Sequence, residues 1–381
     1  PIRIMASAAT SARALSRFPA AVRARHLSSA CPLVYSPAAQ ELKRLPEFAA
    51  AVEYFAAGQY EKALAPAYRA LDVCKSMHVP AMHLLGLEAL ASTHGVLGKV
   101  HDELSAREDQ VTIAAGGRCT EAEALLAQHG LVCAFLRRGD GAAAAAAAKD
   151  GLAAAQEIPD CRALFSAHIT AACLAGSGVD AEDAAAALTG LEAGAGSERA
   201  ASLTAAARVL LAEHYLANGD VAGSIEVARA VVAPEDRVAA RRASVLGRAL
   251  QGSGAVDEAE QELSAALKLA KRVGGADSVE AAEALLDLAA LFAAKLDAIT
   301  AEGLFHSALG KLAHGTGAPG PLSRARVHCA GLAAFADLCD KLEMNGKKRT
   351  REAETAREKA TRLAGAFPEG VAQGTPSMLA L

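Results

Sequence analysis

Residues 246–267 read LGRALQGSGAVDEAEQELSAAL, and residues 288–309 read LAALFAAKLDAITAEGLFHSAL, so the same pattern returns 42 positions later. In both stretches small residues stand at helical spacing with large apolar residues between them, as Ala259 and Leu263 do in the first. Small side chains let two helix axes approach within about 8 to 10 Å. The pattern therefore predicts pairs of closely packed antiparallel helices.

Earlier stretches repeat this pattern, and each contains a Gly where the chain must turn between two helices. One runs from Leu211 to Ala228, another from Tyr54 to Leu71, and a third, almost entirely alanine, surrounds Gly139 and Ala144. Together they predict about seven or eight helix pairs. The turns are expected at Gly58-Gln59, Gly139-Asp140-Gly141, Asn218-Gly219-Asp220, Gly252-Ser253-Gly254 and residues 315–321.

These stretches resemble tetratricopeptide repeats, and the pair with the 42-residue spacing resembles the longer kinesin-light-chain variety. The resemblance is good over residues 209–309 and 48–71. Over residues 81–196 the repeats are plausible but degenerate. It implies an all-α fold, a tetratricopeptide-like α-solenoid of about seven or eight antiparallel helix pairs over residues 46–367. An alanine-rich helical bundle of another kind would also show small residues at helical spacing, and it remains the alternative.

The composition favours helices and disfavours a membrane span. Aromatic residues make up 4% of the chain and Trp is absent, while alanine, the strongest helix former, dominates. No run approaches the roughly 20 apolar residues that a bilayer requires. Eight cysteines lack C-x-x-C spacing, which argues against a disulfide framework or a zinc site. We expect free thiols and a soluble or peripheral protein without a transmembrane helix.

Residues 1–27 have the composition of a mitochondrial transit peptide. They contain five arginines and no acidic residue, and the segment from Arg25 to Ala30 resembles the cleavage pattern of matrix presequences. Met5 is expected to be the initiator, with residues 1–4 as upstream sequence. A basic nucleic-acid-binding arm is the alternative for this segment. Without these five of the 39 basic residues, the 43 acidic residues are in excess by nine, which disfavours nucleic-acid binding by the rest of the chain.

Three further segments lie outside the regular pattern. Residues 28–45 contain Pro32 and Pro37 and show no helical period, so they are expected to form an extended arm. The charged run 351–363 is expected to be a solvated helix that caps the stack. Residues 368–381 are expected to form an irregular tail.

No catalytic, cofactor-binding or metal-binding residue is predicted. Gly95 to Lys99 lacks the glycine spacing and the Ser or Thr of a phosphate loop, and Gly176-Ser177-Gly178 lacks the spacing of a hydrolase elbow, so both are interpreted as turns. Cys74 with His78, four apart on one helix face, could hold a metal, but no carboxylate completes the set. Two weaker candidates are the pair His94 and His101, seven apart, and the group His328, Cys329 and Cys339.

Tetratricopeptide domains that clamp extended peptides typically present a ladder of Asn side chains. Here the matching positions hold Leu210, Val245 and Asp287, and the chain contains only Asn218 and Asn345, both expected in turns. The sequence thus predicts contact with folded proteins or inserted helices through broad surfaces.

These observations favour a non-catalytic scaffold subunit of a large mitochondrial complex, on the matrix side and associated with an inner-membrane complex. Its expected partners are other protein subunits, with no small-molecule substrate and no cofactor. High alanine content, a presequence and degenerate helical repeats together resemble accessory subunits of chlorophycean algal mitochondria, notably those of the ATP synthase peripheral stalk. A matrix adaptor or assembly factor is the runner-up, and an enzyme with a site that spacing does not reveal is the third possibility.

Overall fold

A computed structural model describes most of the chain from residue 44 to residue 365. The described ranges are 44–117, 119–155, 159–174, 184–185, 188, 198–232, 236–314, 321–341, 343–344 and 347–365. The predicted transit segment, all but the last two residues of the predicted arm, and the predicted tail lie outside these ranges.

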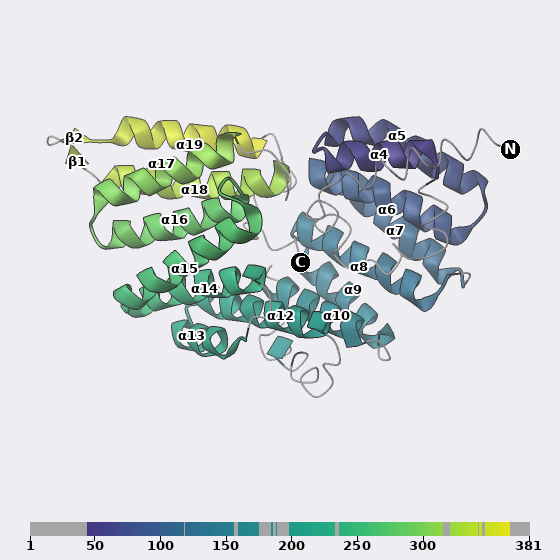
Figure 1. The fold of residues 1–381 in the computed structure, drawn as a ribbon, viewed down its shortest axis with the longest axis horizontal. Helices are drawn as coiled ribbons and strands as arrows, with labels where there is room; N and C mark the ends of the chain where they lie inside the picture. Colours follow the sequence, from purple (N-terminus) through teal and green to yellow (C-terminus); the bar gives the residue numbers. More distant parts are fainter. Residues whose placement is uncertain are drawn as a thin grey trace. The chain divides into compact units, whose positions relative to one another are not determined.

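The chain divides into two compact units, one ending at Leu131 and the other starting at Val132. In the first unit the helices form consecutive antiparallel pairs (Figure 1). Helix α8, Glu121–Arg138, contains the boundary between the units. The helices of the first unit are α4 (Pro46–Ala56) with α5 (Tyr60–Ser76), and α6 (Pro80–Leu97) with α7 (Val100–Ala115).

The second unit continues the same arrangement, and the first helix of one pair contacts the first helix of the next along α12, α14 and α16. These contacts, together with those of α13 with α14 and of α15 with α16, stack one pair on another. The helices are α9 (Gly141–Ala154), α10 (Pro159–Leu174), α12 (Glu198–Ala217), α13 (Val221–Ala230), α14 (Asp236–Ser253), α15 (Val256–Gly274), α16 (Val279–Ala294), α17 (Ala298–His314), α18 (Pro321–Lys341) and α19 (Thr350–Gly365).

The two quoted repeats pack as their sequences predict. Ala259, Leu263 and Ala266 on α15 are buried at the α14–α15 interface, and Ala301 and Phe305 occupy the corresponding places on α17. At Gly247 on α14 an added Cβ would lie 2.6 Å from Cγ of Leu263, so the glycine sets how closely these helices pack. Small residues therefore decide the helix spacing within each pair.

The predicted turns are confirmed where the structure describes them. Backbone φ angles are positive at Gly58, Gly139, Gly219 and Gly254, each at the end of the first helix of a pair. Glycine adopts this left-handed conformation without a Cβ clash. In the pair α16–α17 the same place is taken by Leu296, whose φ is 62°. The predicted turn over residues 315–321 falls mostly outside the described residues.

The region expected to be degenerate is regular where it is described. Helices α6 and α7 form a pair like the others, and α10 packs on α9 and α12. Alanine carries this packing, because Ala144, Ala145 and Ala148 on α9 are buried. Alanine side chains are so small that a row of them does not mark an apolar helix face clearly. The repeats in this region were therefore hard to recognise in the sequence.

The connection before α19 contains a short two-stranded pairing. Residues Glu343–Met344 (β1) pair in antiparallel fashion with Lys347–Lys348 (β2). The last helix, α19, buries Ala353 and Ala356 and exposes most of its charged residues, as expected of a cap. Apart from this two-residue pairing the described chain is helical, so the predicted class, an all-α tetratricopeptide-like α-solenoid, is confirmed. None of the described helices is long and apolar enough to cross a bilayer.

Candidate functional site

The structure does not bring Cys74 and His78 together on one helix face, so that expectation is wrong. Helix α5 ends at Ser76, and His78 lies in the following turn with a φ of 55°. Cys74 is fully buried against Met82 and Leu85, and this burial raises the pKa of its thiol to about 11. The residue is a packing element of the α5–α6 core.

His94 and His101 also lie on different helices, which contradicts the expectation of a shared face. Gly98, with a φ of 74°, ends α6 between them, and His101 begins α7. The His94 ring is buried, and its Nε2 lies 3.0 Å from the Tyr68 hydroxyl. Burial lowers the pKa of His94, so this ring is a neutral hydrogen-bond partner of the core. The sequence predicts a turn over Gly95 to Lys99, but α6 continues to Leu97, and only Gly98 and Lys99 connect it to α7.

The third candidate group lies along α18 in separate surroundings. Cys339 is buried in the core beneath α19, while Cys329 Sγ lies 3.5 Å from the carbonyl oxygen of Ala360. Burial raises the pKa of both thiols. His328 is half-buried and lines a groove described below. Residues 176–178 lie outside the described ranges.

A buried polar network joins α6 to α7 in the first unit. Arg107 forms a bidentate ion pair with Glu88, in which Nη2 donates to Oε1 at 3.0 Å. Gln110 accepts from Arg107 at 2.9 Å and donates to the carbonyl oxygen of Leu84 at 2.9 Å. Burial alone would raise the pKa of Glu88, but Arg107 and the hydrogen bonds from Gln110 and Ser92 lower it to about 2. The network thus ties the two helices together through the guanidinium group of Arg107.

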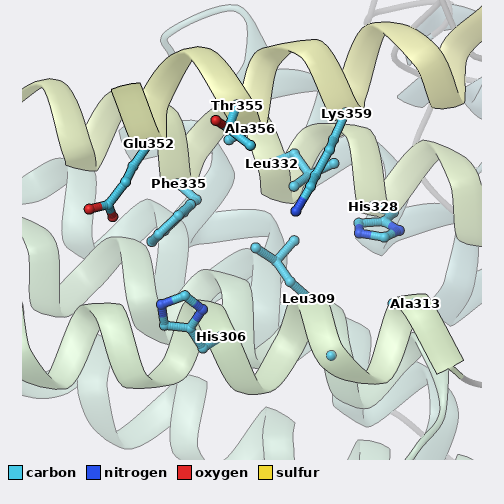
Figure 2. A pocket seen from close by; sticks show the side chains of 11 residues that line it. His306, Leu309, Ala313, His328, Leu332, Phe335, Glu352, Thr355, Ala356 and Lys359 are labelled. Carbon is cyan, nitrogen blue, oxygen red and sulfur yellow. The ribbon is translucent and has the colours of Figure 1, made fainter. Parts of the chain in front are cut away.

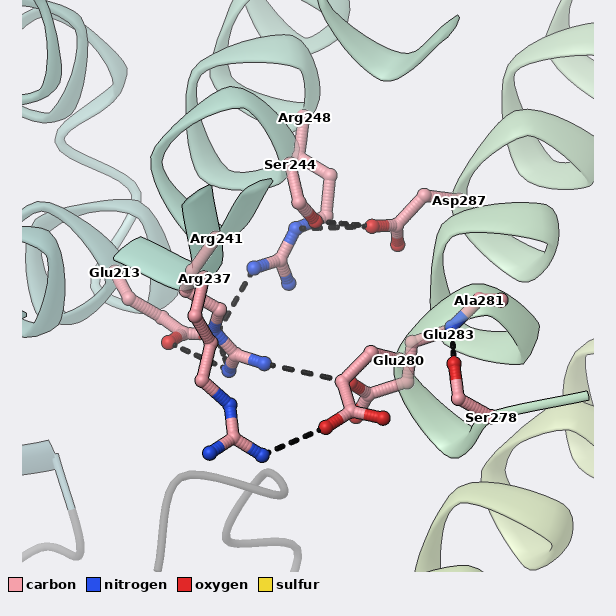
Figure 3. Close-up of polar contacts among 10 residues, drawn as sticks. All are labelled: Glu213, Arg237, Arg241, Ser244, Arg248, Ser278, Glu280, Ala281, Glu283 and Asp287. Atoms are coloured by element: carbon pink, nitrogen blue, oxygen red, sulfur yellow. Dashed lines mark hydrogen bonds and ion pairs between the residues drawn. The ribbon is translucent and has the colours of Figure 1, made fainter. Parts of the chain in front are cut away.

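A larger network spans three successive pairs of the second unit and is called here the arginine ladder (Figure 3). It consists of Arg237, Arg241 and Arg248 on α14 with acidic groups on both flanking first helices. Its contacts are Arg241 to Glu213 of α12 at 2.9 Å and to Glu283 of α16 at 3.5 Å, Arg248 to Glu213 at 2.9 Å and to Asp287 at 3.9 Å, and Arg237 to Glu280 at 2.8 Å.

The centre of the arginine ladder is removed from water. Only 6% of the Glu213 side chain is exposed, and two guanidinium groups face it. Burial opposes ionisation of Glu213, but Arg241 and Arg248 outweigh it and hold the pKa of Glu213 below its usual range. The surrounding acids likewise raise the pKa of both arginines despite their burial. The charges of Glu213, Arg241 and Arg248 therefore persist at neutral pH and link successive pairs.

The positions that would carry an Asn ladder have other roles. Leu210 and Val245 are buried in the core, and Asp287 accepts a hydrogen bond from Ser244 on α14. Asn218 lies in the turn after α12 and is hydrogen-bonded to His214. Asn345 lies outside the described residues. None of the matching positions, Leu210, Val245 and Asp287, offers an amide side chain that could hold an extended peptide.

Helices α17, α18 and α19 enclose a groove of about 610 Å³ (Figure 2). Its floor is apolar and includes Leu309, Leu332 and Phe335. His328 and Lys359 lie at one end, and Glu352 lies at the other (Figure 2). This groove and the arginine ladder are two features of the second unit with chemistry beyond simple packing.

Sequence reasoning did not identify either feature. The acids and bases of the ladder stand about one repeat apart, as Arg241 and Glu283 do, so no local spacing links them. A search for oppositely charged residues separated by one repeat length would have found Arg237 with Glu280. The groove depends on how far apart two helices lie, which composition does not reveal.

Comparisons with known proteins give distant likenesses only. No family model matches the chain, and no curated protein matches it significantly. Solved structures with a similar fold include the apo form of RapI, at 14% identity over 86% of this chain and 98% of that one, with a TM-score of 0.48. The TPR2AB domain of yeast Sti1 in complex with a pHSP90 peptide covers 85% of this chain and 99% of its own at 16% identity, with a TM-score of 0.29. The TPR domain of P58(IPK) covers 89% and 96% at 16% identity, with a TM-score of 0.26. None of these likenesses is strong enough to indicate a partner or an activity.

Proposed function

We propose that the chain is a non-catalytic scaffold that holds other proteins in a large assembly. The observation that carries the proposal is the ionic bracing between successive helix pairs in the second unit. The arginine ladder links three pairs, and the ion pair of Arg349 with Glu302, at 2.8 Å, links the third of them to the last pair. Ionic contacts between successive pairs make a stack resist bending, which suits a protein that positions others.

The chemistry of the described residues is consistent with this role. The charged clusters pair internally, and the described cysteines whose pKa is perturbed have a raised pKa because of burial, the opposite of an activated nucleophile. The candidate metal-binding pair Cys74 and His78 is separated by the end of α5. A helix-pair stack presents broad surfaces, and such surfaces serve protein contact.

The proposed setting is the matrix side of a mitochondrial inner-membrane complex. Its support is the sequence of residues 1–27, with five arginines and no acid. Within that setting we favour an accessory subunit of the ATP synthase peripheral stalk, because a stalk that carries torque requires stiffness more than chemistry. A matrix adaptor or assembly factor uses the same surfaces with transient partners and is the alternative.

Native electrophoresis of a mild-detergent extract from cells that express the tagged chain tests the proposal. Mass spectrometry then identifies the proteins that migrate with it. A scaffold is expected to migrate with a large assembly at fixed stoichiometry, and the co-migrating subunits name the complex. Migration of most of the chain as a free species would exclude a permanent scaffold and leave the adaptor. Absence of the chain from purified mitochondria would exclude the proposed setting alone.

A further inference from the structure

The groove between α17 and α19 is open because these two second helices of successive pairs stand apart over α18. Gly310 lines the groove from α17, and an added Cβ there would have no heavy atom within 4 Å. By contrast, the first helices α16 and α18 contact one another directly. Leu332 and Phe335 of α18, each less than a tenth exposed, form the floor between α17 and α19.

The groove has the dimensions and lining of a helix-binding site. Along α19 its wall runs from Glu352 to Lys359, a rise of about 10 Å or two helical turns. The floor residues Leu332 and Phe335 are held in place by the core beneath them. A volume of about 610 Å³ has room for several large apolar side chains.

The charge at one end of the groove is unbalanced. Lys359 reaches from α19 toward Leu309, and His328 lies at the same end of the groove (Figure 2). Burial, and after it the positive charge of Lys359, lowers the pKa of His328, and among the described residues no carboxylate forms an ion pair with either group. At the other end Glu352 is already paired with Arg349. An acidic group on a ligand therefore finds its complement at Lys359 and not at Glu352.

A helix fits this groove better than an extended peptide does. An extended peptide gains affinity from hydrogen bonds to its backbone, and the walls here are helices whose own backbone groups are already paired. The chain also has only two Asn residues with which side chains could replace such bonds. A helix satisfies its own backbone and needs only apolar contact and a charge at one end.

We propose that this groove binds an amphipathic helix of a partner protein, with large apolar side chains over Leu332 and Phe335 and a carboxylate against Lys359. The proposal rests on the proposed role of the chain in holding other proteins, and it names one surface and one kind of partner for that role.

A peptide display library tests this proposal on the full chain. Random 16-residue sequences are selected on the wild-type protein, and the affinity of each selected peptide is measured by fluorescence anisotropy on wild type and variants. Gly310→Leu should fill the groove without a clash, and Gly303→Leu is its control, because Gly303 lies on the same helix, is equally unobstructed and does not line the groove. Circular dichroism checks that both variants remain helical.

We expect selected peptides with Leu, Ile or Phe at positions i, i+3 or i+4, and i+7, and an Asp or Glu within one turn. Gly310→Leu should weaken their binding by about tenfold or more, and Gly303→Leu by less than about twofold. Lys359→Glu should weaken binding by about tenfold, and exchange of the acid in the peptide for Lys should restore it. Selection of peptides without an acid, or of peptides whose affinity survives Gly310→Leu, would overturn the proposal. The occupant would be a lipid and not a helix if the chain bound oleate vesicles and no peptides, and this result would overturn the proposal as well.

Failure of the groove proposal can be distinguished from failure of the proposed scaffold function. If the wild-type chain retains its partner proteins and the Gly310→Leu chain retains the same set at the same stoichiometry, the groove proposal is wrong and the scaffold role stands. If the wild-type chain retains none, the scaffold role is wrong whatever the peptides do.

Discussion

Glu213 accepts hydrogen bonds from Arg241 at 2.9 and 3.1 Å although its side chain is only 6% exposed. Substitution of Glu213 by Gln should lower the free energy of unfolding by about 3 to 5 kcal/mol, because two guanidinium groups would face a neutral partner in a site with little water. Urea unfolding followed by circular dichroism measures this loss.

An exposed ion pair of the same unit provides the control. Arg229 and Glu258 link α13 to α15 with more than half of each side chain exposed. Arg229→Ala should change the free energy of unfolding by less than about 1 kcal/mol, because solvent screens the pair. An equal loss for both variants would mean that the arginine ladder braces the stack no more than a surface pair does.

Glu88 makes part of the stability of the first unit depend on pH. Its pKa is lowered from 4.5 to about 2 in the folded chain, chiefly because the pairing with Arg107 outweighs burial. The stabilising effect is therefore complete above about pH 5 and is lost as the pH falls from about 4.5 to 2. Comparison of wild type with Glu88→Gln by urea unfolding at several pH values should show a difference that shrinks across this window. A difference that stays constant down to pH 2 would show that Glu88 does not remain ionised as described.

Leu296 is a strained residue in the turn where the other repeats have Gly. Its φ is 62°, and its side chain is 90% exposed, so it gains little from burial. Leu296→Gly should raise the free energy of unfolding by about 0.5 to 1 kcal/mol by removing the Cβ clash of the left-handed conformation. Differential scanning calorimetry would register this as a higher Tm.

Two companion variants separate backbone strain from the loss of an exposed apolar group. Gly254→Ala should be destabilising by about 1 kcal/mol, because Gly254 has a φ of 85° and open space around it. Ile299→Ala, which removes an equally exposed apolar side chain from α17, should leave the Tm nearly unchanged. If Ile299→Ala raises the Tm as much as Leu296→Gly does, strain is not the cause.

The sequence predicts the helix pairs well because their signals are local. Gly254 and Gly139 mark turns, and Ala259 with Leu263 marks a packing face within a single helix. Helix ends are less certain from sequence, and this uncertainty is why Cys74 and His78 were expected on one helix although α5 ends between them.

The arginine ladder and the groove depend on relations between repeats. From sequence alone Arg241 is expected to be a solvated surface charge. The fold brings Glu213 of α12 and Glu283 of α16 next to it. Burial then decides its role. An ion pair in water contributes little to the free energy of unfolding, whereas loss of one partner of a buried ion pair lowers that free energy strongly. The groove likewise follows from the spacing of α17 and α19, which no residue in either helix specifies alone.

Gly151 and Gly310 should respond in opposite ways to the same substitution. Both lie within helices, where Ala is favoured over Gly by about 0.5 to 1 kcal/mol. At Gly310 the added methyl group meets nothing within 4 Å, so Gly310→Ala should raise the free energy of unfolding by that amount. At Gly151 an added Cβ would lie 2.2 Å from the buried ring of Phe165, and the resulting overpacking should lower the free energy of unfolding by about 1 to 3 kcal/mol. Gly151→Ala combined with Phe165→Leu should recover part of this loss, since the smaller side chain leaves room for the methyl group. If both single variants were stabilising, α9 and α10 would have to pack less closely than Gly151 and Phe165 indicate.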